Sequence, residues 1–287
     1  MGVEDLVGVE PACSAPGPVV GRADSDPILR TEKVGKSFGG LVALEDASIR
    51  AHLGEVTGIM GPNGAGKTTL FNVITGNLGA TTGRVFVKGH DASRFSPYRI
   101  ARLGVARTFQ SPRVFPSLRV VDNVILGRYP LAGEKALSAL FGRVRVAKRE
   151  RAAREEALEA LGSVGLLDCA DELACNLGYA QRKIIEIARG VMQDAELFLL
   201  DEPFSGIHGE VVSRMEGTIC GLRERGAAVC LIEHNVGALT RLADYVYVLN
   251  EGRLIAEGTS REIRTNPVVI EAYLGKERAR VLTAGDH

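Results

Sequence analysis

The stretch Gly61–Thr69 constrains the fold of this chain more than any other feature. It reads Gly-Pro-Asn-Gly-Ala-Gly-Lys-Thr-Thr and fits the pattern G-x-x-x-x-G-K-[ST] at every fixed position. The apolar run 56–60 before it is typical of a short buried strand, and residues 70–75 after it are typical of a helix. Glycines let the backbone curl so that successive N–H groups form an anion cradle, to which the helix adds its positive end. The stretch therefore predicts a binding site for a nucleoside triphosphate.

Each residue of this phosphate loop has an expected role. Lys67 reaches the β- and γ-phosphates as a point charge, and the hydroxyl of Thr68 is placed to ligate Mg²⁺. The other loop residues predicted to contact the nucleotide are Gly61, Pro62, Asn63, Gly64, Ala65, Gly66 and Thr69.

Composition limits the other possibilities. A chain of 287 residues can form one large α/β domain or two smaller ones. Its formal net charge is zero, so no overall field directs it toward nucleic acid or anionic lipid. No apolar run approaches the length of a transmembrane helix, and no signal peptide is expected at the N-terminus. We expect any role at a membrane to depend on a partner.

The order of predicted elements indicates an α/β fold, because buried strands alternate with helices after the phosphate loop. We interpret residues 1–27 as a disordered extension, 28–257 as the folded domain and 258–287 as a tail that is helical in part. A helical subdomain is expected at about 111–177. Strands are expected at 56–60, 83–87, 104–110, 196–200 and 227–232, with hairpins over 32–49 and 245–257. Helices are expected at 70–75, 97–103, 181–192 and 211–223.

Polar residues follow several of these strands, where parallel sheets bind their ligands. Asp201 and Glu202 end the apolar strand 196–200, so Asp201 is expected to hold Mg²⁺ and Glu202 to act as the general base for an attacking water. Gln110 is expected to complete the Mg²⁺ shell. His234 is expected to contact the γ-phosphate, although a histidine in that position is more often a satisfied polar group.

Two further features have alternative interpretations. Phe38 precedes the turn Gly39-Gly40, where its ring could stack on adenine or simply be a core or turn aromatic. Six basic residues lie between Arg143 and Arg154 and could form a nucleic-acid patch. Glu150, Glu155 and Glu156 interrupt them, which favours a solvated helix face.

In these motifs the chain resembles the ABC ATPase family across nearly all of residues 28–257. The resemblance rests on five ordered motifs, which are Gly61–Thr69, Gln110, Leu177–Gln181, Leu197–Glu202 and His234. It implies a P-loop NTPase cassette with a mainly parallel core sheet, an antiparallel β subdomain and a helical subdomain. It also implies ATP and Mg²⁺ as cofactors and a sandwich of two subunits around two ATP molecules. The signature of each subunit, here Leu177, Gly178, Tyr179, Ala180 and Gln181, then contacts the ATP of its partner.

More closely, the chain resembles the Liv-type G subunits of branched-chain amino-acid importers. The resemblance rests on residues 38–43, 106–110, 176–179 and 232–234 and on the tail Val269–Gly275. It implies transmembrane permease subunits and a second ATP-binding subunit as partners, an extracytoplasmic solute-binding protein acting indirectly, and a location at the cytoplasmic face of the membrane. It implies no nucleic-acid partner. The alternative is a soluble ABC ATPase that acts on nucleic acid or the ribosome, against which the neutral charge counts.

Two departures from the family pattern affect the expected mechanism. Gly178 stands where the general signature has Ser, and Ala180 where a Gly is usual. Without the hydroxyl, one hydrogen bond to the γ-phosphate of the partner's ATP is lost, at about 1.5–3 kcal/mol. His208, after Asp201–Ile207, stands where the family has Asp or Asn in a loop that communicates between sites. We therefore predict functional asymmetry, with an active phosphate loop in this chain and a weak signature.

Overall fold

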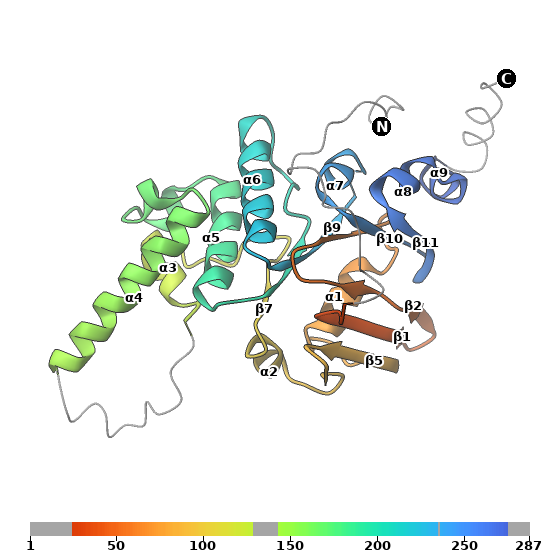
Figure 1. Cartoon of the computed structure of the whole chain (residues 1–287), viewed down its shortest axis with the longest axis horizontal. Coiled ribbons are helices and arrows are strands. Elements are labelled where there is room, and N and C mark those ends of the chain that lie inside the picture. Colours follow the sequence, from red (N-terminus) through yellow and green to blue (C-terminus); the bar gives the residue numbers. More distant parts are fainter. Residues whose placement is uncertain (1–24, 129–142, 235, 275–287) are drawn as a thin grey trace.

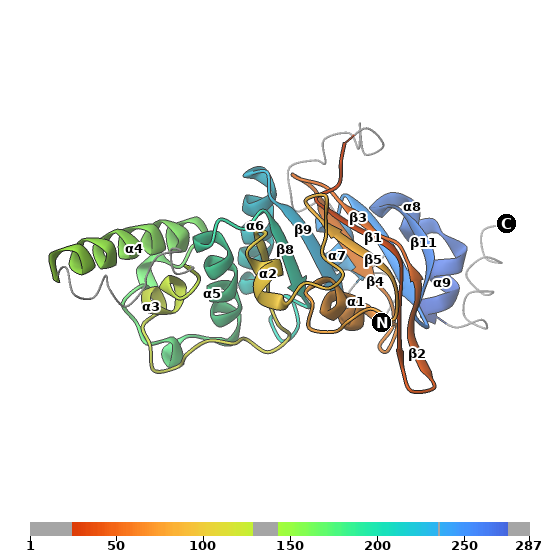
Figure 2. The same cartoon turned by 90° about the horizontal axis from the view of Figure 1, so that it is seen from below.

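The computed structural model describes residues 25–128, 143–234 and 236–274. Most of the extension predicted at 1–27, and the end of the tail predicted at 258–287, lie outside these residues. The described part forms two sheets with helices around them (Figures 1 and 2).

A six-stranded sheet forms the centre of the described part, in the order β11-β10-β4-β9-β8-β7. Strands β10, β4, β9, β8 and β7 are parallel, and β11 runs antiparallel to β10. The strands are β4 (Val56–Met60), β7 (Val105–Arg107), β8 (Leu197–Asp201), β9 (Ala228–Glu233), β10 (Tyr245–Asn250) and β11 (Arg253–Thr259). The mainly parallel core sheet predicted from the sequence is confirmed.

An antiparallel sheet packs beside the core sheet and confirms the predicted β subdomain. Its order is β2-β1-β5-β6, with β3 also paired to β1. The strands are β1 (Leu29–Phe38), β2 (Leu41–Ala47), β3 (Arg50–Ala51), β5 (Thr82–Val87) and β6 (His90–Asp91).

The central strands β4, β8 and β9 are buried on both faces, which explains why they read as continuous apolar runs. In β8, Leu197 and Leu199 pack on one side with the residues of α1 (Lys67–Ile74). Phe198 and Leu200 pack on the other side. The helices on that second side are α5 (Tyr179–Met192), α6 (Glu210–Glu224) and α7 (Val236–Leu242).

Helices form a lobe at one end of the molecule and a smaller group at the other (Figures 1 and 2). The lobe contains α3 (Val120–Ile125) and α4 (Arg143–Ser163), which pack against α5. At the opposite end, α8 (Ser260–Thr265) and α9 (Pro267–Leu274) lie against β11. A short helix, α2 (Pro97–Ala101), precedes β7. Across the described ranges, no helix is both long and apolar enough to span a bilayer.

Several element boundaries differ from the sequence predictions, and three of these differences lie near the phosphate loop, the Gln110 segment and the signature. Helix α1 starts at Lys67 rather than residue 70, directly after Gly66 in the left-handed conformation. The strand predicted at 104–110 ends at Arg107, because the next N–H that β8 offers, that of Asp201, bonds to the side-chain hydroxyl of Thr108 at 3.2 Å. Helix α5 starts at Tyr179 rather than residue 181.

Candidate active site

The backbone of the phosphate loop is closely surrounded by neighbouring chain segments. A Cβ on Gly61 would lie 2.2 Å from the carbonyl oxygen of Leu249, and one on Gly66 would lie 2.6 Å from that of Ala43. Gly66 also has φ 100°, a conformation that favours glycine. The carbonyl of Ala65 accepts a hydrogen bond from the N–H of Gly252 at 3.1 Å. Strand β2 and the β10–β11 turn therefore fix the shape of the loop.

Lys67 is folded back into the loop. Only 6% of the residue is exposed, and its Nζ donates to the carbonyls of Gly61 at 2.7 Å and Pro62 at 3.0 Å. Burial lowers the pKa of Lys67, against the charges of Glu202, Asp201 and Glu233, which raise it. Asn63, Gly64 and Thr68 are exposed, so the loop opens to solvent where phosphate is expected.

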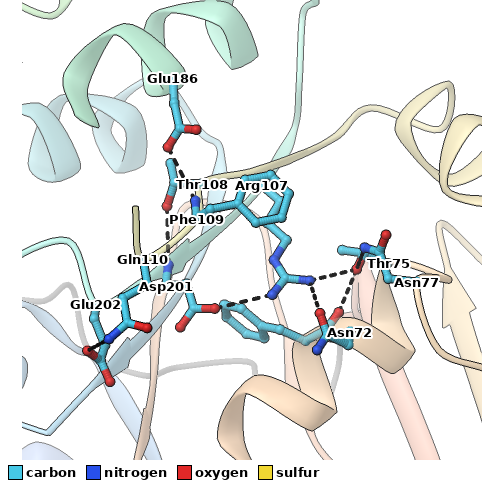
Figure 3. A network of polar contacts seen from close by, with 11 residues as sticks. Asn72, Thr75, Asn77, Arg107, Thr108, Phe109, Gln110, Glu186, Asp201 and Glu202 are labelled. Carbon is cyan, nitrogen blue, oxygen red and sulfur yellow. Dashed lines mark hydrogen bonds and ion pairs between the residues drawn. The ribbon is translucent and has the colours of Figure 1, made fainter. Parts of the chain in front are cut away.

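Asp201 ends β8 and forms a buried ion pair (Figure 3). Nη2 of Arg107 lies 3.2 Å from Oδ2 of Asp201, and both side chains are almost fully buried. Nη1 of Arg107 donates to Asn72 at 2.7 Å and Thr75 at 3.0 Å, both in or at the end of α1. Burial raises the pKa of Asp201, while Arg107 lowers it. Arg107 therefore links the helix of the phosphate loop to the predicted Mg²⁺ carboxylate.

Glu202 follows directly and has an unusual backbone. Its φ is 49°, in the left-handed region that non-glycine residues rarely adopt. Its Oε2 accepts a hydrogen bond from Nε2 of Gln110 at 3.2 Å, and its Oε1 lies 3.9 Å from Nδ1 of His234. The structure thus brings Gln110, Glu202 and His234 together at the carboxyl ends of β7, β8 and β9.

The residues predicted to hold Mg²⁺ fit a hard cation. Asp201 uses Oδ2 for Arg107, which leaves Oδ1 for the ion or one of its waters, and the Thr68 hydroxyl is exposed beside the loop. In the described ranges no cluster of three or more His, Cys, Asp and Glu side chains could enclose a metal. This sparse ligand set suits Mg²⁺, which keeps waters and shares substrate phosphates rather than filling an all-protein cage.

The signature residues lie away from the phosphate loop of the same chain. Gly178 to Gln181 line a cavity of about 370 Å³ with Gly206, His208 and Arg214, and no phosphate-loop residue lines it. The Tyr179 hydroxyl donates to the carbonyl of Gln110 at 2.7 Å. Ala180 is only 7% exposed and belongs to a core cluster, which leaves Gly178 as the main departure from the signature. Leu177 is also buried.

Phe38 ends β1 at the turn to β2. The residue is 45% exposed, so it is not a core aromatic, and both the turn aromatic and the adenine-stacking interpretations stay open. Nζ of Lys36 lies 5.0 Å from the ring centroid and donates to the carbonyl of Gly79 at 2.8 Å. The ring therefore remains available for stacking.

Sequence reasoning missed several charged residues that hold the site. Lys183 and Glu186 lie on the buried side of α5, at 2% and 6% exposure. Glu186 accepts from the N–H of Phe109 at 3.2 Å and of Arg113 at 2.7 Å, and burial raises its pKa. Nothing in the sequence signals this burial, because Lys183 lies beside the apolar stripe of the predicted helix and Glu186 lies on the opposite side, where a charged side chain is expected to face solvent.

Comparisons with known proteins agree with the motifs. The chain matches the ABC transporter family over residues 44–205 and the branched-chain amino acid ATP-binding cassette transporter family over residues 253–279. A high-affinity branched-chain amino acid transport ATP-binding protein of Pseudomonas aeruginosa is 36% identical over 253 residues, covering 88% of this chain and 99% of the relative. The protein of the same description from Escherichia coli is 34% identical over 257 residues, with coverages of 88% and 99%.

Solved structures give the same result. The crystal structure of an ATP-binding cassette of an ABC transporter in its ADP conformation aligns with a TM-score of 0.75 at 32% identity. It covers 88% of this chain and 100% of the solved chain. A nucleotide-free ATP-binding cassette from an ABC transporter aligns with a TM-score of 0.74 at 34% identity and the same coverages.

Proposed function

Because the chain belongs to the ABC transporter family of ATP-binding proteins, we propose that it powers an importer for branched-chain or related amino acids. As a member of this family, the chain is an ATP-binding ATPase of a transporter. The observation that supports this site is the position of two strand ends at one edge of the core sheet. Strand β4 leads into the loop that contains Lys67, and β8, two strands along the sheet, ends at Asp201 and is followed by Glu202.

In this proposal the phosphate loop binds the nucleotide. The loop amides and the ammonium of Lys67 contact the phosphates, and the ring of Phe38 stacks on adenine. Thr68, Gln110 and Asp201 are the residues that hold Mg²⁺. The ion neutralises charge on the β- and γ-phosphates when bound.

In this proposal Glu202 and His234 catalyse hydrolysis. The Glu202 carboxylate accepts the proton of the attacking water, while His234 contacts the γ-phosphate and orients that water. The Gln110 side chain donates a hydrogen bond to Glu202. In this proposal it transmits changes at the ATP site to the loop that follows it, residues 111–118. Support for these roles comes from the 3.2 Å and 3.9 Å approaches of Gln110 and His234 to Glu202.

Each complete site requires a second ATP-binding subunit, whose signature covers the ATP on this chain's phosphate loop. In return, Leu177 to Gln181 cover the ATP of that subunit, and His208 lies in the loop between the two sites. The cavity shared by the signature and His208 supports this arrangement, because it places both on one surface.

The transported solute is inferred from the relatives. Their descriptions name branched-chain amino acid transport, and the tail matches the corresponding family over residues 253–279. In this proposal the chain docks on permease subunits at the cytoplasmic face of the membrane, and an extracytoplasmic binding protein delivers the solute to them.

The substitution Glu202→Gln tests the assigned chemistry. It should leave ATP affinity close to that of the wild type, reduce turnover by about 10²- to 10⁴-fold and favour the closed dimer. Fluorescent-ATP binding and phosphate release measure the two quantities separately. Turnover at the wild-type rate would place the base elsewhere.

Co-purification with the permeases tests the importer. The complex in vesicles should show ATPase activity that rises when binding protein and a branched-chain amino acid are added. The competing function, an ABC ATPase acting on nucleic acid or the ribosome, predicts stimulation by nucleic acid instead. It has little support on α4, where Arg151 pairs with Glu155 and Arg154 pairs with Asp171.

A further inference from the structure

The backbone of Glu202 needs an external restraint. A glutamate at φ 49° is in a sparsely populated conformation, and such residues persist only where their surroundings hold them. Two backbone hydrogen bonds contribute, from the N–H of Glu202 to the carbonyl of Ile232 at 3.0 Å and from the N–H of Ser205 to the carbonyl of Glu202 at 3.1 Å. Neither involves a side chain.

The side chain that completes the restraint is Lys183. Its Nζ donates to the carbonyl oxygen of Glu202 at 2.6 Å, to that of Ser205 at 3.2 Å and to that of Pro203 at 3.5 Å. The residue is 2% exposed, so water cannot replace these bonds without local opening. The Lys183 ammonium is thus hydrogen-bonded to three carbonyls of the turn that begins with Glu202.

The same helix also reaches the Glu202 carboxylate. Tyr179 lies one turn before Lys183 on α5, and its ring centroid is 5.1 Å from Nζ of Lys183. The Tyr179 hydroxyl holds the carbonyl of Gln110, whose side chain in turn donates to Oε2 of Glu202. Both ends of Glu202, its backbone carbonyl and its carboxylate, are therefore linked to α5.

We propose that Lys183 is a positioning residue for ATP hydrolysis, which holds the left-handed backbone of Glu202 so that its carboxylate stays at the attacking water. The proposal rests on the assignment of Glu202 as general base made above. A residue that acts through Glu202 affects the chemical step and leaves nucleotide binding unchanged. A residue that only stabilises the fold affects the reaction equally whether or not the base is present.

A double-mutant cycle in the assembled transporter distinguishes the two. The variants are Lys183→Met, Glu202→Gln and the combination, with kcat from steady-state or single-turnover phosphate release and affinity from a fluorescent ATP analogue. K183M should lower kcat by about 10- to 100-fold, the effect of losing hydrogen bonds to a charged group, with little change in affinity. In the E202Q background it should lower the residual rate less than about threefold.

The matched control is Arg189→Met, which removes another cation from the same helix. Arg189 donates to Arg113 and Asn123, and in the described ranges these hydrogen bonds do not involve residues 201–205. R189M should lower thermal stability but reduce kcat less than K183M does. If K183M does not fold, Lys183→Gln takes its place in the cycle with the same criterion, because the amide keeps a donor.

Two results would overturn the proposal. One is an equal fold-loss from K183M with and without Glu202, and the other is a kcat loss from K183M no larger than that from R189M. Wild-type turnover by E202Q alone would instead refute the assigned base, so failure of the proposed function is recognised separately.

Discussion

Glycine is structurally required in the phosphate loop but not in the signature. In the loop, Gly61 and Gly66 leave no room for a Cβ, which would lie within 2.2 Å and 2.6 Å of backbone oxygens. In the signature, Gly178 has ordinary extended torsions, and the nearest atom to a Cβ would be a side-chain oxygen of Gln181 at 3.5 Å. The first region requires glycine for its geometry, whereas the second accommodates other residues.

This difference indicates that the phosphate loop and the signature are under different structural constraints. The phosphate-loop side retains its ammonium, its buried Arg107–Asp201 pair and its left-handed Glu202. The signature side lacks the hydroxyl that would contact the partner's γ-phosphate, although nothing steric prevents one. We therefore expect this chain to hydrolyse ATP at its own loop and to serve its partner's site weakly.

The largest expected effect is at the phosphate loop. Lys67→Ala removes the ammonium that lies among the loop carbonyls, and ATP binding should fall below detection. The chain contains no Trp, so a fluorescent ATP analogue is the suitable probe. Lys88→Ala removes a lysine that pairs with Glu196 just before β8, away from the loop, and as the control it should retain most of the affinity. Unchanged ATP affinity in Lys67→Ala would refute the loop assignment.

Repair of the signature should give the next largest effect. Gly178→Ser restores a hydroxyl at the N-cap of α5, where serine is favoured. Turnover at the partner's site should rise by up to about 10- to 100-fold, the value of one hydrogen bond to a charged group. Hydrolysis is measured with Glu202→Gln in the same chain, so that only the partner's site contributes. No gain in this background would remove Gly178 as the cause of asymmetry.

A matched pair of alanines compares the two glycines directly. Gly66→Ala places a Cβ against Ala43 and forces a residue other than glycine to φ 100°, so it should destabilise the fold by about 1–3 kcal/mol. Gly178→Ala should change stability by less than about 1 kcal/mol. Urea unfolding of both variants measures the difference. Equal losses would contradict the contrast between the two regions.

The smallest effect is expected at the contact between the signature and the segment that contains Gln110. Tyr179→Phe removes the hydrogen bond from the signature to the carbonyl of Gln110 and should cost about 0.5–1.5 kcal/mol of stability. Hydrogen exchange in residues 108–113 should increase while ATP affinity stays unchanged. Protection equal to that of the wild type would show that this bond does not hold the loop.

The sequence predicted the elements that depend on local pattern. The buried strand before Asp201 and the phosphate loop were both recognisable, because apolar runs and fixed glycine spacing are local signals. The end of β7 was not, since it depends on a hydrogen bond between Asp201 and the hydroxyl of Thr108, two residues far apart in the sequence. Likewise Arg107 and Lys183 gave no sign of touching Asp201 and Glu202, because those contacts arise only when the helices pack.

The predicted asymmetry between the two ATP sites can be measured in the assembled complex. The complex with the second ATP-binding subunit is prepared with the base carboxylate neutralised in one subunit at a time, and ATPase activity is compared. Glu202→Gln should abolish most of the activity, while the equivalent change in the partner should leave most of it. Equal losses from the two changes would contradict the predicted asymmetry between the two ATP sites.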